Sequence, residues 1–132
     1  MRNMTLDPKQ YTLGQLIERL EKLSRNSDED LPITFDFAGL PPTNFDSYRG
    51  YYDHLALGHG SESAFDDMRI SGLLEIASAA LGQEFEGWKG GSYIMDDGTP
   101  LWVANPGSAG GTAIVGVKSL GYMAIIKTKH ID

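Results

Sequence analysis

Two short stretches of the sequence each combine aromatic rings, one cation and glycine. Residues 45–52 (FDSYRGYY) place Arg49 among four aromatic residues, and residues 85–93 (FEGWKGGSY) place Lys89 among three aromatic residues and three glycines. Aromatic faces stack on planar bases, arginine or lysine holds phosphate, and glycine lets backbone come close to a ligand. Seven of the 13 aromatic residues fall in these two stretches, which is more clustering than core packing requires. Together the two stretches predict a nucleotide pocket.

A glycine-rich segment, residues 106–112 (PGSAGGT), could add backbone N–H groups for a phosphate. It lacks the GK[ST] ending of a P-loop and runs into a β-branched stretch rather than a helix. A hairpin loop that needs positive φ explains it equally well. The predicted ligand-binding residues from these segments and their margins are Tyr48, Arg49, Tyr51, Phe85, Trp88, Lys89, Tyr93, Asn105, Ser108 and Thr112.

The aromatic stretches also have a purely structural interpretation. Tyrosine favours strands, and a tryptophan beside a glycine-rich turn often covers the edge of a core. For either stretch alone the structural interpretation is favoured. The binding hypothesis is favoured only when the two stretches are considered together.

The histidines and acids predict neither a metal site nor a catalytic site. His54 and His59 lie near Asp53 and Glu62, but their spacing matches no established ligand pattern, so surface histidines are the favoured interpretation. The chain has no cysteine and no GxSxG elbow. The acid doublets at 66–67 and 96–97 are typical of solvated turns and helix N-termini. We therefore expect no catalytic residue, metal or cofactor.

Length and charge limit the function classes. A chain of 132 residues fits a single domain spanning 1–132. Its formal charge of −7 argues against nucleic-acid polymers and anionic membranes as partners. The absence of cysteine fits a reducing compartment, the N-terminus lacks the apolar stretch of a signal peptide, and no run reaches transmembrane length. These features predict a cytoplasmic protein.

Two helices and several strands must position these residues. Apolar periodicity predicts helices over 12–24, with Thr12 as N-cap and Gln15 completing a capping box, and over 71–81, with Ser71 as N-cap and Gly82 as the stop. Alternation predicts strands over 33–37 and 47–57, separated by a loop over 38–46 that Pro41 and Pro42 enforce.

Four further short strands are predicted over 92–95, 101–105, 112–117 and 121–128, with turns at 97–98, 106–107 and 120–121. Short consecutive strands with tight turns favour antiparallel pairing. The predicted fold is α+β: an antiparallel β-sheet of about five to six strands with two α-helices packed on it.

Residues 34–117, which include FDFAGLPPTNFDSYRGYYDHLALG and FEGWKGGSYIMDDGTPLWVANPGSAGGTAIVGV, resemble small bacteriophage-encoded proteins of the first family of Thoeris anti-defence proteins. The resemblance implies a non-enzymatic sponge in the host bacterial cytosol. Such a sponge sequesters cyclic ADP-ribose-type immune signals, and some members hold cyclic oligonucleotides. It also implies a homo-oligomer with pockets between protomers. This chain departs from the expected pattern because no arginine follows Arg69, so Lys89 or Lys118 would replace a late pocket arginine.

Two other functions stay open from the sequence. One is an acidic phage inhibitor that binds and blocks a host protein, with its charge mimicking nucleic acid. The other is a small nucleotide hydrolase, which would release an altered ligand. Free sheet edges and the apolar stretches 94–105 and 124–126 also favour a homo-oligomer.

Arg49 provides a direct test of the binding hypothesis. If it grips a phosphate, Arg49→Ala should weaken ligand binding by about 2–4 kcal/mol, and Arg49→Lys should recover only part of that loss because an ammonium lacks the guanidinium fork. Melting temperature and ligand affinity should be measured on the same variants. A destabilised variant with unchanged affinity per folded molecule would show that Arg49 has a structural role instead.

Overall fold

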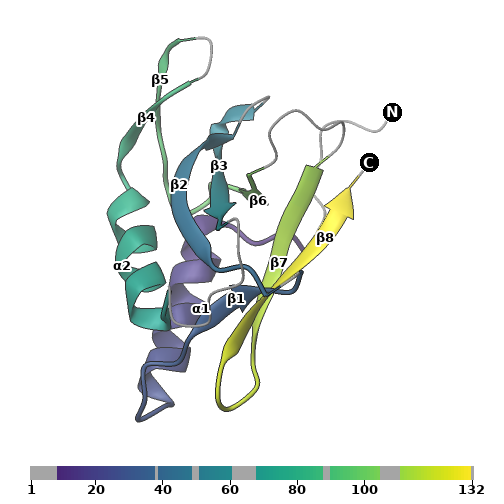
Figure 1. Ribbon diagram of the computed structural model, residues 1–132. Helices are drawn as coiled ribbons and strands as arrows, with labels where there is room; N and C mark the ends of the chain where they lie inside the picture. The colour runs from purple at the N-terminus through teal and green to yellow at the C-terminus, as the bar shows by residue number, and fades with distance from the viewer. Residues whose placement is uncertain are drawn as a thin grey trace.

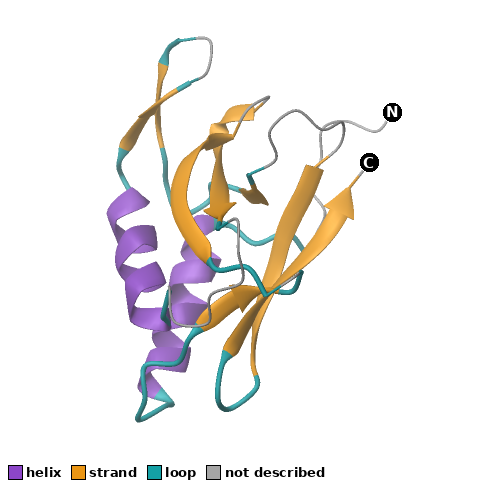
Figure 2. Cartoon of the chain, viewed as in Figure 1, coloured by secondary structure: helices purple, strands orange, loops and turns teal. Residues whose placement is uncertain are grey.

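The computed structural model describes residues 9–37, 39–48, 51–60, 68–87, 90–104 and 111–131. Within them, two helices accompany a six-stranded sheet, ordered β1-β8-β7-β6-β3-β2, and a separate two-stranded hairpin, β4-β5 (Figures 1 and 2). The predicted α+β class with two helices is confirmed. The elements are α1 (Leu13–Arg25), β1 (Ile33–Phe35), β2 (Pro42–Tyr48), β3 (Tyr51–His59), α2 (Ile70–Ala80), β4 (Glu84–Glu86), β5 (Ser92–Ile94), β6 (Leu101–Val103), β7 (Gly111–Ser119) and β8 (Ala124–Ile131).

Helix α1 forms as its sequence predicts. The Thr12 hydroxyl accepts from the Gln15 N–H, and the Gln15 side chain accepts from the Thr12 N–H, so the predicted capping box is present. Leucines at helical spacing form the buried stripe of this helix; they are Leu13, Leu16, Leu20 and Leu23. In the part of the chain that the structure describes, neither helix is long and apolar enough to cross a membrane.

Helix α2 begins one residue earlier than predicted, and Ser71 is not its N-cap. Arg69 occupies the cap position without a side-chain cap bond. The carboxylate of Asp30, 41 residues away from Ser71 in the chain, instead accepts from the Ser71 N–H at 2.9 Å and from its hydroxyl. A capping group supplied from so far away leaves no local sequence signal, which explains the error.

The sheet is mixed rather than wholly antiparallel. β1 pairs with β8 and β3 pairs with β6 in parallel, while the β2–β3, β6–β7 and β7–β8 pairs are antiparallel. Parallel neighbours need a long crossover, and the chain supplies one between β3 and β6 by inserting α2 and the β4–β5 hairpin. Turn signals between consecutive strands predict only antiparallel neighbours, so neither parallel pair follows from them.

The proline-rich stretch does not form the predicted loop over its whole length. β2 begins at Pro42, and β3 is a separate strand rather than a continuation of one strand over 47–57. β2 lies at the edge of the sheet, where a first-position proline costs no central ladder bond. Strand β4, at 84–86, was not predicted because only Phe85 of its three residues is buried.

The helices pack on one face of the six-stranded sheet, and the main core lies between them (Figure 2). Alternation along β3 and β6 sends Leu55, Leu57, Leu101 and Val103 into this core. A second, smaller cluster lies on the other face and contains Tyr48, Ala56, Trp102 and Ala113.

Residues 10–13 complete the middle of the sheet, where β6 and β7 share a single paired position, Trp102 with Ala113. The Tyr11 N–H donates to the Ile114 carbonyl at 2.7 Å, and the Tyr11 carbonyl accepts from the Leu101 N–H at 3.0 Å. The buried Gln10 side chain donates to the Leu101 carbonyl at 2.9 Å. The segment before α1 therefore bridges two strands that diverge from each other.

Gly14, in the first turn of α1, lies against the turn that precedes β6. Its N–H donates to the Asp97 carbonyl at 2.9 Å, and a Cβ added at Gly14 would lie 2.8 Å from the Asp97 Cβ. We expect Gly14→Ala to lower the free energy of unfolding by about 1–3 kcal/mol, because the clash outweighs the better helix propensity of alanine. Urea unfolding measures this change.

Gly72 in α2 is the matched control. A Cβ there would meet the flexible end of Met68, whose sulfur lies 3.0 Å away. Gly72→Ala should therefore be neutral or stabilise the protein by up to about 1 kcal/mol. Equal effects of the two substitutions would contradict the close approach at Gly14.

Candidate functional site

Three rings gather on the helix-free face of the sheet, and we call Tyr48, His54 and Trp102 the aromatic cluster. The Tyr48 and Trp102 rings stack with centroids 4.8 Å apart and planes 2° from parallel. Their exposed fractions are 8% and 7%, so each ring is largely covered. One face of Tyr48, a predicted ligand-binding residue, is thus occupied by Trp102, which is not among the predicted ligand-binding residues.

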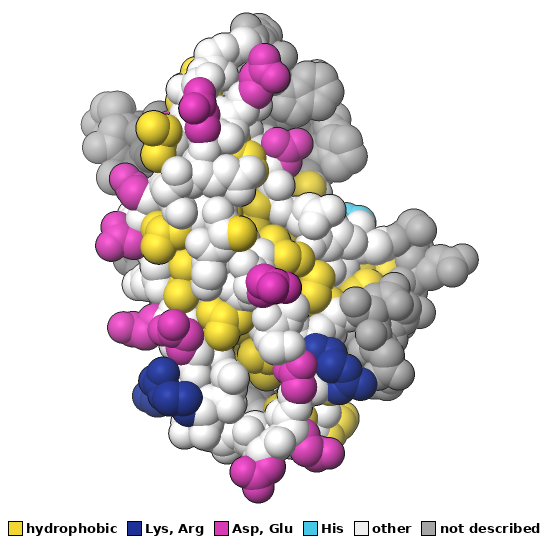
Figure 3. All heavy atoms as spheres, turned by 90° about the vertical axis from the view of Figure 1, so that its left-hand side faces the viewer, with side chains coloured by type: hydrophobic (Ala, Val, Ile, Leu, Met, Phe, Trp, Pro, Cys, Tyr) yellow, Lys and Arg dark blue, Asp and Glu magenta, His cyan; other side chains and the backbone are white. Residues whose placement is uncertain are grey.

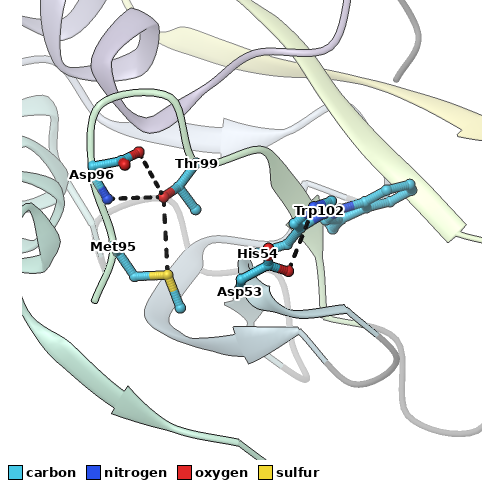
Figure 4. A network of polar contacts seen from close by, with 6 residues as sticks. All are labelled: Asp53, His54, Met95, Asp96, Thr99 and Trp102. Atoms are coloured by element: carbon cyan, nitrogen blue, oxygen red, sulfur yellow. Dashed lines mark hydrogen bonds and ion pairs between the residues drawn. The ribbon is translucent and has the colours of Figure 1, made fainter. Parts of the chain in front are cut away.

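His54 is hydrogen-bonded to the indole N–H of Trp102. The Trp102 Nε1–H donates to His54 Nδ1 at 3.0 Å, and the two ring planes differ by 13° (Figure 4). Because an indole N–H can only donate, Nδ1 must be the unprotonated nitrogen and Nε2 carries the proton. Asp53 Oδ1 lies 3.8 Å from Nε2, beyond hydrogen-bond distance, and this carboxylate is 73% exposed, so the pair adds little to the stability of the fold.

The environment of His54 favours its neutral form. Burial lowers the pKa of His54 below its ordinary value of 6.5, and the neighbouring Asp53 carboxylate partly opposes this shift. The neutral ring is also the form that accepts from Trp102. Desolvation and hydrogen bonding therefore act in the same direction.

Small residues make room for the indole. The strand registers place Ala56, Trp102 and Ala113 in one row across β3, β6 and β7. Gly111 lies at the rim of the same cluster, where an added Cβ would be 2.6 Å from Trp102 Cζ3 and 2.7 Å from the Tyr48 hydroxyl oxygen. No larger residue fits at Gly111 unless the stacked pair shifts.

The aromatic cluster also joins the described ends of two sequence segments that were predicted to bind a ligand. Tyr48 directly precedes Arg49 in the chain. Ala104, which precedes Asn105, packs against the buried cluster of Tyr48, Ala56, Trp102 and Ala113, and Gly111 directly precedes Thr112. The ends of β2 and β6 and the start of β7 thus meet at a single stacked pair.

The other predicted residues within the described structure lie elsewhere. Phe85 and Tyr93 are cross-strand partners in the β4–β5 hairpin and pack with the main core on the helix side of the sheet. Thr112 is half-buried and pairs with His130; because side chains alternate along β7, it points to the face opposite Ala113 and Trp102. These three residues therefore do not join the aromatic cluster.

The remaining predicted residues fall outside the described side chains. Arg49, Trp88, Lys89, Asn105 and Ser108 lie outside the described residues. Tyr51 is described only by its backbone, which pairs with Tyr48 across the β2–β3 connection.

The roles of Trp102, His54 and Gly111 are not predicted from the sequence. His54 was interpreted as a surface histidine, but its side chain is only 16% exposed and bonded to Trp102. A weak signal existed for Trp102, because alternation in the Leu101–Val103 strand sends its central residue away from the core. The contact between His54 and Trp102 spans 48 residues, so no local pattern reveals it.

A second polar group visible in Figure 4 is structural. The Thr99 hydroxyl accepts from the Asp96 N–H at 2.9 Å (Figure 4). The Asp96 carboxylate accepts from the Gly98 N–H at 2.9 Å. This arrangement confirms the interpretation of the 96–97 doublet as a turn. Across the described ranges, no group of three His, Cys, Asp or Glu residues could hold a metal ion.

Comparisons with family models, with curated proteins and with solved structures gave no match to this chain.

The pKa shift of His54 predicts a pH-dependent stability. Since the folded-state pKa of His54 lies below 6.5, the unfolded chain binds more protons than the folded chain does as the pH falls. The contribution of neutral His54 is complete above pH 6.5 and is lost as the pH falls through the folded-state pKa. We expect the wild-type melting temperature to drop as the pH falls below about 6.5, and His54→Gln to flatten this dependence.

His59, which is exposed and whose Nδ1 lies 2.9 Å from the Gly60 carbonyl, offers the control. His59→Gln should keep the wild-type slope of melting temperature against pH. If His54→Gln keeps that slope as well, burial of His54 is not the cause of the pH dependence.

Proposed function

We propose that this protein binds a small anionic nucleotide and holds it without chemical change. The first candidate ligand is a cyclic ADP-ribose-type immune signal, and the second is a cyclic oligonucleotide, with the host bacterial cytosol as the place of action. The observation that supports the proposal is that Tyr48 and Gly111 both lie against Trp102, with Ala104 packed on the same buried cluster. Two predicted ligand-binding residues, Arg49 and Asn105, directly follow Tyr48 and Ala104 in the sequence.

Fixed contacts at the ends of the predicted binding segments favour tight binding. The parallel Tyr48–Trp102 stack, the hydrogen bond from Trp102 to His54 and the close approach of Gly111 each fix the same end of the sheet. Fixing the anchors of a binding segment before the ligand arrives reduces the entropy lost on association. A site that sequesters its ligand gains from this stiffness through slow release.

The described contacts of His54 fit a protein that binds its ligand unchanged better than one that catalyses a reaction. Nδ1, the basic nitrogen of the neutral ring, already accepts from an indole, and the Nε2 side faces the Asp53 carboxylate. A general base needs its basic nitrogen directed at a substrate proton. A protein that binds a ligand without converting it needs no general base.

The ligand itself can be identified directly. Purified protein would be exposed to a panel of cyclic nucleotides, washed and heat-denatured, and the released molecules analysed by mass spectrometry. We expect a cyclic nucleotide to be recovered intact. A converted product would indicate a hydrolase. If no nucleotide is retained and calorimetry shows no heat with any of the panel, the binding proposal is wrong and the inhibitor of a host protein becomes the leading alternative.

Gly111→Ala tests whether the aromatic cluster supports binding. The added methyl group would displace Tyr48 or Trp102, so we expect ligand affinity to fall by about tenfold or more and stability by about 1–3 kcal/mol. Gly116→Ala on the same strand is the control, because its Cβ would come no closer than 4.0 Å to the Tyr11 hydroxyl oxygen. Isothermal calorimetry on folded protein compares the two. Unchanged affinity in a destabilised Gly111→Ala protein would separate the cluster from the binding site.

A further inference from the structure

The exposed large apolar side chains of the described residues fall into two pairs. Leu81 and Ile94 are 45% and 71% exposed and lie at the base of the β4–β5 hairpin. Leu120 and Tyr122 are 40% and 68% exposed and lie at the turn between β7 and β8. Figure 1 shows these two hairpins at opposite ends of the molecule.

The first pair has acidic surroundings, and we call Leu81, Glu84, Glu86 and Ile94 the acidic hairpin face. Glu84 is directly opposite Ile94 in the ladder, and Glu86 is opposite Ser92, so all four hairpin residues share the outward side. Phe85 and Tyr93 occupy the other side and pack on the core. On the side of the molecule that carries α2 and this hairpin, apolar side chains run down the middle with acidic ones along them (Figure 3).

The second pair has basic surroundings, and we call Lys118, Leu120, Tyr122 and Lys127 the basic tip. Lys118 pairs with Ile125, and Lys127 lies two residues further along β8, so the two exposed lysines share one face of the ribbon. The turn between them is closed by a 2.8 Å bond from the Leu120 N–H to the Met123 carbonyl. Residues 111–131 contain three lysines and no Asp or Glu.

We propose that the acidic hairpin face of one copy of this chain binds the basic tip of another. Each surface presents two exposed apolar side chains beside two charges, and the charges of the two surfaces are opposite. Apolar contact with complementary charges is the usual composition of a specific protein interface. This inference does not depend on the ligand proposed above.

A second copy is the partner that these observations favour. The base of the β4–β5 hairpin and the β7–β8 turn are well separated in the molecule, so the two surfaces cannot meet within a single chain (Figure 1). Two acidic hairpin faces would repel each other, and so would two basic tips, which excludes pairing of like with like. Contact between unlike surfaces joins copies head to tail or in a dimer with two such contacts.

Complementation between two variants tests this pairing. Ile94→Asp damages the acidic hairpin face and leaves the basic tip, whereas Tyr122→Asp does the reverse. At high micromolar concentration, we expect analytical ultracentrifugation to show wild-type oligomers, monomers of each variant alone, and a dimer only when the variants are mixed. Circular dichroism confirms that both variants fold, since both positions are exposed.

A charge exchange then tests the role of the ions. Glu84→Lys with Glu86→Lys should abolish wild-type assembly, as should Lys118→Glu with Lys127→Glu, and mixing these two double variants should restore it. Higher salt should weaken the wild-type contact. Three outcomes would overturn the proposal: a monomeric wild type, a Tyr122→Asp protein that still self-associates, or a mixture of folded variants that stays monomeric.

Discussion

The six-stranded sheet depends on how its shortest central strand is held. β6 has three residues and pairs with β7 at one position, yet it separates the main core from the aromatic cluster. The backbone of Tyr11 bonds both strands where they diverge, and Gln10 adds a buried bond to Leu101. An unpaired buried backbone group costs about as much as a lost hydrogen bond, so these contacts let so short a strand occupy the middle of a sheet. The same segment leads directly into α1 and fixes where that helix begins.

Because β6 is fixed from both sides, its alternation determines two environments at once. Leu101 and Val103 enter the core, and Trp102 enters the opposite face between two alanines. The indole then acts as the common partner of Tyr48 and His54, which come from different strands. The aromatic cluster is therefore a consequence of how the core is built as well as a candidate site, and a substitution that loosens β6 should affect both.

The parts of this structure that sequence predicts are those set by local chemistry. The α1 helix follows from its leucine spacing and its capping box, and the β7–β8 hairpin follows from its turn residues. The parallel pairs, the Asp30 cap on α2 and the contact between His54 and Trp102 all join residues that are far apart in the chain. Their formation depends on packing that no short window contains. For the same reason, the sequence suggested that the two aromatic stretches serve one pocket, whereas the structure places Phe85 and Tyr93 with the core and Tyr48 on the opposite face.

The net charge of the whole chain does not show how unevenly the charged residues are distributed along it. The chain carries −7, but residues 111–131 carry three lysines without an acid, so the remaining residues together carry −10. A uniform excess of negative charge would keep copies apart. The opposite charges beside the exposed Ile94 and Tyr122 would instead, in the proposed contact, give each copy an attractive approach to the next. Electrostatic attraction of this kind sets orientation and encounter rate, while the apolar side chains that lose water contribute most of the affinity. The two kinds of residue at each hairpin thus have separate physical roles in one contact.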